Sequence, residues 1–568
     1  MRTVNQGYLE KIKKEAEKIE NEIIAAIKSG QSFRVEAGAG AGKTYSLNKV
    51  INWIQKEKFK ELQRDKKFVV CITFTNTAVE VIKDRLISNS FIIPSTIHSF
   101  AWSAIKQYQI HLIKFIKDKY HLDKILKVDY SIEKNKPGSE VYNLSHDDVI
   151  EAFSNLLDNE KFRNLFSRKY PIILIDEYQD SNKILIGKFV EHFISKKIGP
   201  IFGFFGDSWQ TIYDLSQVCG EIEHENLKII KKIINYRSAP RIVEVLNFLR
   251  PSLPQYAYHS NEEGEVLVIT NDFCNNRNKG GYYKDDLVDE EIKTRLDKLT
   301  SILHRDVYKE NESSKVLMIT HKRLAMQQGY SNIANSILIQ RDDDPVVLFV
   351  VNYIEPVYDA LYKSDSGRLF ELLKIRRYPV LKKSDKTRWK QFFESLILAR
   401  KNRLIDVLKV VFDFGYIQAP DKVIELYKKY QNKSNELYAG GKCTIEKFLE
   451  IKYSEFEALN GFLSSDSLYS TEHGVKGEEY DNIIYVIGKG WRDYEFEKYM
   501  PHLCENPLLK DKNFIKNRNL FYVCSSRARK RLLIFVTTPL TPPFKQFLIN
   551  MVGKENIIDF DEYVNSFN

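Results

Sequence analysis

Residues 33–47 read FRVEAGAGAGKTYSL, and part of this stretch matches the phosphate-binding loop pattern (A/G)-x-x-x-x-G-K-[ST]. Its glycines allow backbone N–H groups to turn inward around phosphate oxygens. Lys43 supplies a point charge for the outer phosphates, and Thr44 supplies a hydroxyl for Mg²⁺. A helix starting near Lys43 would aim its positive N-terminal end at the same anion. The residues predicted to bind a nucleoside triphosphate here are Ala37, Gly38, Ala39, Gly40, Ala41, Gly42, Lys43 and Thr44.

Short apolar runs alternate with helical stretches along the chain. Runs that predict strands lie at residues 33–35, 68–73, 171–175, 200–205, 265–270, 315–320, 481–488 and 531–537. Continuous apolar strands between helices are typical of parallel sheets that are buried on both faces. Because the pattern starts again after residue 240, we predict an α/β fold with two parallel sheets. Ligands are then expected at the carboxyl ends of the strands.

Three other stretches predict helices. Residues 8–29 place Leu and Ile at helical spacing among Lys and Glu, which is typical of an amphipathic helix. Residues 101–168 and 345–462 are mostly helical in pattern. Each predicted sheet is therefore interrupted by a mostly helical insertion.

The composition excludes several classes of protein. The 568 residues include 86 basic and 76 acidic side chains, a net charge of +10 that is compatible with a polyanionic partner. The six cysteines have no C-x-x-C spacing, so neither a zinc ribbon nor an iron–sulfur cluster is predicted, and a reducing cytoplasm is expected. No apolar stretch is long enough to span a bilayer, and the charged start lacks a signal-peptide core, so no membrane contact is expected.

An acidic string, DEYQD, follows the predicted strand at 171–175. Asp176 is placed to hold Mg²⁺, directly or through water. Glu177 is placed to polarise the attacking water. With a phosphate loop upstream, the pair favours nucleotide hydrolysis over the alternative of a solvated acidic strand end.

A series of strings in one order resembles the UvrD/Rep-type (superfamily 1A) DNA helicases. The resemblance begins at the phosphate loop, includes DEYQD and extends to residue 529. The other strings are TFTNTA (73–78), TIHSF (96–100), GDSWQTIY (206–213), NYRS (235–238), TEHGVKGEEY (471–480) and YVCSSRAR (522–529). Each string alone is weakly specific, but their common order makes the set very specific.

The resemblance implies two RecA-like lobes with a 1A/1B/2A/2B-like architecture. Residues 1–100 and 166–240 would form the first lobe, and residues 241–344 and 463–568 the second. The helical insertions would be reduced counterparts of domains 1B (residues 101–165) and 2B (residues 345–462).

The resemblance also implies a role for residues on both sides of an ATP site. Gln210 would sense the γ-phosphate, and Arg237 and Arg527 would clamp it, one from each sheet. Tyr236 would stack on the adenine, and Glu479 would approach the ribose. With ATP and Mg²⁺ as cofactors, the implied catalytic residues are Lys43, Glu177, Gln210, Arg237 and Arg527, and the metal ligands are Thr44 and Asp176.

Single-stranded DNA or a tailed duplex is the substrate that the resemblance implies. Such proteins stack bases on aromatic side chains and hold the backbone with polar groups. The predicted DNA contacts are Phe74, Thr75, Asn76, Thr96, His98, Phe100, Trp209, Tyr213 and His473. For the two histidines, a positional role in a loop is an equal alternative. Residues 374–390 hold eight basic residues and one acidic residue, which favours either a duplex contact or a solvated helix face.

Two features leave the precise role open. The adenine-reading Gln of the family falls near Asn21 or Glu22, so the choice between ATP and GTP is open. The compact length is similar to that of the helicase-like subunit of Gabija-type phage-defence systems, which works with a separate nuclease. The first hypothesis is a 3′–5′ translocase or helicase in DNA repair or phage defence. The alternative is an ATP- and DNA-sensing adaptor that licenses a separate nuclease without processive unwinding.

Overall fold

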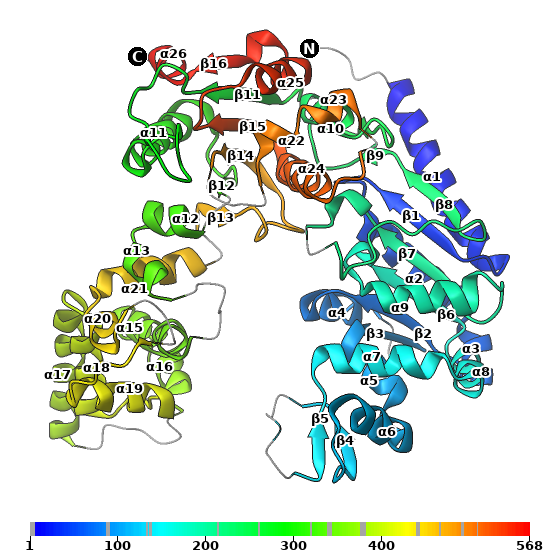
Figure 1. Cartoon of the computed structure of the whole chain (residues 1–568), viewed down its shortest axis with the longest axis horizontal. Helices are drawn as coiled ribbons and strands as arrows, with labels where there is room; N and C mark the ends of the chain where they lie inside the picture. The colour runs from blue at the N-terminus through cyan, green and yellow to red at the C-terminus, as the bar shows by residue number, and fades with distance from the viewer. Residues whose placement is uncertain are drawn as a thin grey trace.

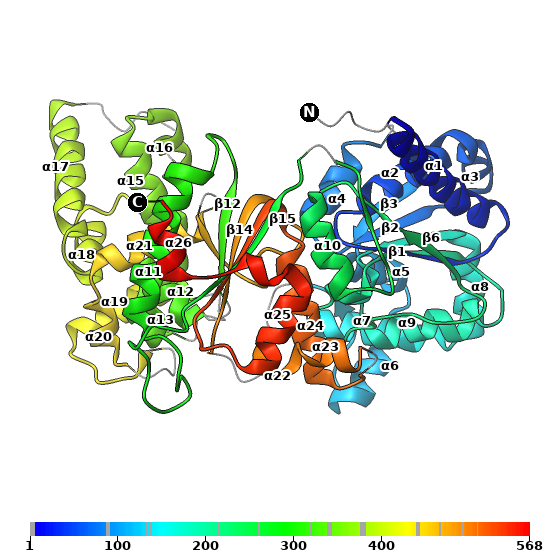
Figure 2. The same ribbon diagram turned by 90° about the horizontal axis from the view of Figure 1, so that it is seen from above.

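Two parallel sheets and two mostly helical insertions make up the protein in a computed structural model (Figures 1 and 2). The residues that the structure describes are 6–86, 91–131, 135, 139–212, 215–259, 262–318, 321–337, 344–374, 382–438, 443–464, 467–489, 494–507 and 509–567. The predicted α/β fold class is confirmed. Among these residues, no helix is both long and apolar enough to cross a bilayer.

The first sheet has six parallel strands in the order β3-β2-β6-β7-β1-β8. Its strands are β1 (Phe33–Ala37), β2 (Val69–Thr73), β3 (Ile92–Thr96), β6 (Ile172–Asp176), β7 (Ile201–Gly206) and β8 (Lys228–Lys232). The helices next to them are α1 (Gln6–Lys28), α2 (Lys43–Glu57), α3 (Phe59–Asp65), α4 (Asn76–Lys83) and α9 (Lys183–Phe189). The apolar pattern missed β3 and β8, because these edge strands are only partly buried and lack a continuous apolar run.

The second sheet repeats this plan, with six parallel strands in the order β13-β12-β14-β15-β11-β16. Its strands are β11 (Glu265–Thr270), β12 (Ser314–Met318), β13 (Tyr469–Thr471), β14 (Tyr480–Ile487), β15 (Ala528–Val536) and β16 (Ile557–Asp559). The helices around it are α10 (Pro240–Leu249), α11 (Asp289–Ile302), α22 (Phe496–Tyr499), α23 (His502–Glu505), α24 (Lys512–Ser525), α25 (Pro542–Val552) and α26 (Phe560–Asn565). Between the sheets in sequence, β9 (Ile234–Asn235) pairs with β10 (Tyr256–Ala257).

Each sheet is interrupted by one insertion (Figure 1). The first contains α5 (Ile97–Ile105), α6 (Gln109–Tyr120), β4 (Lys127–Asp129), β5 (Val141–Asn143), α7 (His146–Leu157) and α8 (Glu160–Lys169). The mostly helical prediction omitted the short pair β4 and β5, because three-residue strands leave no periodic signal. The second holds α12 (His321–Gln328), α13 (Ser331–Ser336), α14 (Pro345–Phe349), α15 (Glu355–Tyr362), α16 (Ser366–Leu372), α17 (Lys383–Arg400), α18 (Leu404–Phe414), α19 (Asp421–Gln431), α20 (Ile445–Leu449) and α21 (Tyr453–Leu463).

Strand β6 illustrates why continuous apolar runs were the correct signal. Ile172 and Leu174 pack on one face with residues of α1 and α2, whereas Ile173 and Ile175 pack on the other face with residues of α7 and α9. Successive side chains of a strand point to opposite faces, so a strand covered on both faces must be apolar at every position. With both faces covered, the carboxyl edge of the sheet is where ligands can approach.

Glu472, just after β13, is a buried acid in the core of the second sheet. Glu472 is 0% exposed, and no described residue lies in hydrogen-bond geometry with either carboxyl oxygen, although the Tyr485 hydroxyl is near enough to oppose the rise in its pKa. Val475, Tyr485 and other apolar residues form the surrounding core. Burial raises the pKa of Glu472 well above its ordinary value near 4.5. The carboxyl group is therefore a cost to stability that grows as the pH rises.

We expect Glu472→Leu to raise the free energy of unfolding by about 1–3 kcal/mol at pH 7, because an unpaired polar group is removed from the core. The wild-type carboxyl has a raised pKa in the folded state, so its contribution is most favourable below pH 4.5 and is lost as the pH rises toward the folded pKa. The difference between variant and wild type should therefore grow from pH 5 to pH 8. Urea unfolding at several pH values measures it.

Glu244→Leu is the matched control for this experiment, since the Glu244 side chain is 61% exposed on α10. It should change the unfolding free energy by less than about 0.5 kcal/mol at every pH. A stability gain of Glu472→Leu that stays constant between pH 5 and pH 8 would contradict the assignment of a raised pKa.

Candidate functional site

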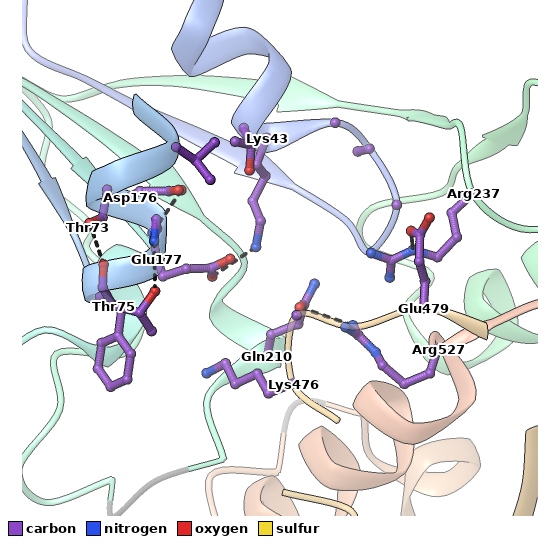
Figure 3. Close-up of a pocket in the computed structure, with 18 of the residues that line it drawn as sticks. Lys43, Thr73, Thr75, Asp176, Glu177, Gln210, Arg237, Lys476, Glu479 and Arg527 are labelled. Atoms are coloured by element: carbon purple, nitrogen blue, oxygen red, sulfur yellow. Dashed lines mark hydrogen bonds and ion pairs between the residues drawn. The ribbon is translucent and has the colours of Figure 1, made fainter. Parts of the chain in front are cut away.

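A cleft of about 870 Å³ lies at the carboxyl edge of the first sheet and is lined by residues of both sheets' loops (Figure 3). The structure thus brings together predicted residues that are far apart in sequence. The predicted ATP-site residues that line the cleft are Gly38, Gly40, Ala41, Gly42, Lys43, Thr44, Asp176, Glu177, Gln210, Tyr236, Arg237, Glu479 and Arg527. Ala37 and Ala39 are buried and do not line it.

The phosphate loop joins β1 to α2 in the predicted conformation. Gly40 and Gly42 have φ angles of 70° and 72°, which side chains rarely allow. A Cβ atom on Gly40 would lie 2.6 Å from Oδ1 of Asn235, so backbone and side chain pack too closely for any other residue. Helix α2 begins at Lys43 and directs its N-terminal end toward the cleft. The loop therefore offers backbone N–H groups and a helix N-terminus to phosphate.

Lys43 contacts the predicted catalytic glutamate directly. Its Nζ atom lies 3.0 Å from Oε2 of Glu177. Burial raises the pKa of Glu177, but the charges of Lys43 and Lys476 and the hydrogen bonds from Lys43 and Gln179 together outweigh this effect and hold the pKa at about 2. Glu177 also has a φ angle of 47°, in the left-handed region that non-glycine residues seldom adopt. Backbone strain of this kind is often found at functional sites, where the surroundings hold a side chain in place.

Asp176 fits the role of a magnesium ligand. It ends β6 next to Glu177, and its Oδ1 atom accepts a hydrogen bond from the Glu177 backbone at 3.0 Å. Burial raises the pKa of Asp176 to about 7, and the charge of Glu177 adds to this effect. A bound cation would favour the ionised form. One carboxylate and the Thr44 hydroxyl suit Mg²⁺, which usually takes few protein oxygens besides phosphate and water.

Arg527 and Gln210 meet across the cleft. Arg527, directly before β15, is 1% exposed and donates from Nη2 to Oε1 of Gln210 at 3.3 Å. Burial lowers the pKa of Arg527 to about 9, and the nearby charge of Arg237 acts in the same direction. Among the described residues, no carboxylate lies within salt-bridge distance of Arg527, so its charge is available for an anion.

Arg237 and Glu479 form an ion pair in the cleft, with Nε of Arg237 2.7 Å from Oε2 of Glu479. Arg237 also donates to the backbone oxygen of Ser526 at 3.1 Å. The two side chains were predicted to contact the γ-phosphate and the ribose, respectively. In this structure they pair with each other, and both line the cleft.

Tyr236 lies beside the phosphate loop, where a base could stack. Its ring is 5.0 Å from that of Tyr258, and its backbone N–H donates to the Gly40 oxygen at 2.9 Å. The adenine-reading Gln of the family was expected near Asn21 or Glu22 on α1. The buried polar side chain in this part of α1 is Glu20. Glu20 accepts hydrogen bonds from Ser46 and from Lys232, the latter at 3.0 Å.

Sequence reasoning gave no role to Lys476 and Asp180, although both belong to quoted strings. In the structure they form an ion pair between the loop after β13 and the DEYQD string. Burial raises the pKa of Asp180 to about 6 in spite of the lysine charge. Because both residues belong to strings that resemble the helicase family, the sequence could have indicated a role for each. That they contact one another is seen only in the tertiary structure.

The predicted DNA contacts divide into exposed and buried residues. Phe74 is 52% exposed and lines the cleft together with Thr75 and His473. Thr75 also caps α4, which begins at Asn76, by accepting a hydrogen bond from the Ala78 backbone at 3.2 Å. Phe74 and Thr75 therefore extend the nucleotide cleft toward the end of β2.

Other predicted DNA contacts serve the protein itself. Phe100 is 1% exposed and packs edge-on against Phe153, so the prediction that it stacks on a base is wrong. It lies on the inward face of α5, which the short string could not reveal. Thr96 caps the same helix. The His98 ring lies 4.7 Å from that of His146, and burial and this second histidine lower the pKa of His98.

Trp209 is also engaged by protein. The guanidinium carbon of Arg518 lies 3.7 Å from the centre of its ring. A base contact by Trp209 stays a prediction that requires Arg518 to move. Tyr213 and residues 375–381 of the basic stretch lie outside the described residues.

Comparisons with known proteins agree with this geometry. Residues 20–216 match the AAA domain family. The chain is 24% identical to Gabija protein GajB of Bacillus cereus (strain HuB5-5), over 95% of this chain and 98% of that protein. It is 24% identical to the ATP-dependent DNA helicase Rep of Buchnera aphidicola subsp. Schizaphis graminum, over 94% and 96% of the two chains. It is 26% identical to the ATP-dependent DNA helicase PcrA of Bacillus subtilis (strain 168), over 40% of this chain and 39% of that protein.

The matches to Gabija protein GajB and to Rep cover 95% and 94% of this chain and so include both sheets and both insertions. Residues 20–216 match the AAA domain family, and over most of its length the chain is homologous to Gabija protein GajB and to Rep, a superfamily 1 DNA helicase of the PcrA and UvrD type.

Proposed function

We propose that this protein is an ATP-dependent DNA translocase or helicase that acts on single-stranded DNA. The observation that carries the proposal is the cleft, in which Lys43, Glu177 and Gln210 of the first sheet face Arg527 of the second. The exposed ring of Phe74 lines the same cleft. Phosphate chemistry and a platform for a base are thus adjacent, as a motor on a strand requires. The lobes and insertions predicted from the sequence are part of this proposal, with one difference: α12 and α13 pack into the core of the second insertion, ahead of the predicted boundary at residue 345.

In the proposed reaction, a water oxygen attacks the γ-phosphorus of ATP, and the bond from that phosphorus to the β–γ bridging oxygen breaks. Glu177 accepts the proton of the water, and ADP and phosphate leave. Its low pKa keeps Glu177 ionised at neutral pH, as a base must be. The ATP phosphates would draw Lys43 away from Glu177 and so free the carboxylate. Mg²⁺ held by Thr44 and Asp176 would neutralise phosphate charge.

Movement would follow from opening and closing of this cleft. Arg527 reaches the γ-phosphate only when the second sheet is held against the first, so ATP favours the closed arrangement. After hydrolysis the charge that attracts Arg527 is reduced, and the sheets can separate. A base stacked on Phe74 would shift with each cycle. We propose the 3′–5′ direction, which is what the resemblance of the sequence strings implies.

The test of this proposal is the ATPase rate with and without single-stranded DNA. We expect DNA to stimulate hydrolysis, and Lys43→Ala to lower the stimulated kcat by about 10²-fold or more, because it removes a positive charge from the transferring phosphoryl group. Lys49→Ala is a suitable control: Lys49 lies on the same helix but contacts the exposed ring of Tyr45. A wild-type ATPase that ignores DNA would rule out the motor.

Strand displacement separates the motor from the adaptor. A motor with the proposed direction should unwind a duplex with a 3′ single-stranded tail and fail on a 5′-tailed one. The similarity to Gabija protein GajB supports the second candidate, in which the chain senses ATP and DNA and licenses a separate nuclease. DNA-stimulated hydrolysis without displacement of either duplex, together with ATP-dependent capture of a nuclease encoded beside this chain, would favour the adaptor.

A further inference from the structure

Arg250, which follows α10, belongs to none of the strings quoted from the sequence. Helix α10 packs against β15 and α24 of the second sheet. The Arg250 side chain is 3% exposed and leaves that sheet to form ion pairs with Glu36 of β1 and with Asp207 after β7. Its Nη1 atom lies 2.5 Å from Oδ1 of Asp207. One guanidinium therefore joins the second sheet to two carboxylates of the first.

Asp207 in turn fixes the amide of Gln210. Its Oδ2 atom accepts a hydrogen bond from Nε2 of Gln210 at 2.8 Å, while Oδ1 accepts from Arg250 and from the Trp209 backbone. Because the amide nitrogen of Gln210 donates to the Asp207 carboxylate, the amide oxygen must point away from Asp207. That oxygen accepts from Arg527 at 3.3 Å. The amide orientation thus follows from a carboxylate on one side and a guanidinium on the other.

Glu36 ties the same arginine to the strand that enters the phosphate loop. Its carboxylate accepts hydrogen bonds from the hydroxyls of Tyr178 at 2.9 Å and Ser208 at 3.0 Å. Glu36 and Asp207 are 4% and 0% exposed, so both need a cation nearby. In the part of the chain that the structure describes, Arg250 is the cation within salt-bridge distance of Asp207. A planar fork can bind both acids, which an ammonium cannot do in the same geometry.

We propose that Arg250 is a positioning residue for ATP hydrolysis: by bridging Glu36 and Asp207, it orients Gln210 toward Arg527 at the γ-phosphate. This inference rests on the proposed function, since it assigns a role in that reaction. Without Arg250, Asp207 is a buried carboxylate with no cation of the described residues within salt-bridge distance, although Lys43 and Arg518 lie near enough to feel its charge, and it must rotate or recruit water. Gln210 then loses the group that fixes its amide, while the phosphate loop and Lys43 keep their own contacts.

The test measures kcat and KM for ATP with saturating single-stranded DNA in three variants. Arg250→Met removes the charge and keeps much of the volume, so kcat should fall by about 10–10²-fold while KM changes by less than about 3-fold. Arg250→Lys keeps the positive charge but not the planar fork of the guanidinium, so its kcat should fall by about 5-fold. Arg241→Met, on the helix α10 that precedes Arg250, is the control, since Arg241 pairs with Glu244 on the surface.

A double-mutant cycle separates positioning from mere support of the fold. In a Gln210→Ala background, Arg250→Met should lower kcat by less than about 2-fold, because the amide that Arg250 positions is already absent. Equal losses in both backgrounds would overturn the inference. If Arg250→Met does not fold, Arg250→Lys decides: wild-type kcat in that variant also overturns it. An inactive wild-type protein would instead be a failure of the proposed function.

Discussion

Glu177→Gln should lower the kcat of DNA-stimulated ATP hydrolysis by about 10³-fold, because it removes the base that accepts the proton of the attacking water. Nucleotide affinity should be unchanged or higher. The pair between Lys43 and Glu177 at 3.0 Å competes with the phosphates for the lysine charge, and a neutral amide competes less. Single-turnover hydrolysis and binding of a fluorescent ADP analogue measure the two quantities separately.

The matched control for this variant is Glu244→Gln, which changes an exposed carboxylate on α10 and should leave both quantities unchanged. A Glu177→Gln enzyme within about 10-fold of the wild-type kcat would show that another group accepts the proton. Asp180 would then be the next candidate, since burial raises its pKa to about 6 and it lies close to Glu177.

The second large effect is expected from Arg527→Ala, with a loss of about 10³-fold in kcat. Arg527 is buried, reaches Gln210 across the cleft, and also donates to the Glu478 backbone oxygen at 3.1 Å. Removing it deletes the charge that the second sheet brings to the γ-phosphate. Arg527→Lys should restore little, because a lysine cannot make these separate contacts and still reach the phosphate.

Rate measurements at saturating ATP, paired with binding of the ADP analogue, test this expectation. ADP lacks the γ-phosphate, so its affinity should change by less than about 3-fold in Arg527→Ala, and the loss should appear in kcat. Arg305→Ala, at an exposed arginine paired with its neighbour Asp306, controls for loss of a surface charge. A variant that loses ADP binding as strongly as hydrolysis would place Arg527 in ground-state binding rather than in the transition state.

The nucleotide half of the site could be predicted from the sequence because its chemistry is local. Lys43 and Thr44 follow a glycine-rich turn, and Asp176 and Glu177 follow an apolar strand, so one short segment sets each position. Parallel pairing then brings the ends of β1, β6 and β7 to one edge. The strong core strands were found for the same reason, whereas the edge strands β3 and β8 carried a weaker signal.

The DNA side could be predicted less well. Phe74 and Phe100 each lie in a quoted string, yet one is 52% exposed and the other 1%. Which face of a helix or loop points inward depends on packing partners such as Phe153, which lies elsewhere in the chain. A match between short strings identifies the type of residue at a position, but it does not show whether the side chain points into the core or toward solvent.

The sequence by itself determined the two-sheet α/β fold, the phosphate loop and the acidic pair, because each depends on residues that are close together in the chain. The string resemblance already assigned Arg527 to the site, but only the tertiary structure decided which groups of the first sheet the second sheet contacts. Arg250, Lys476 and Arg527 reach Asp207, Asp180 and Gln210 from distant positions in the chain. Such pairs depend on how the two sheets dock, and a buried charge is stable only where docking supplies its partner.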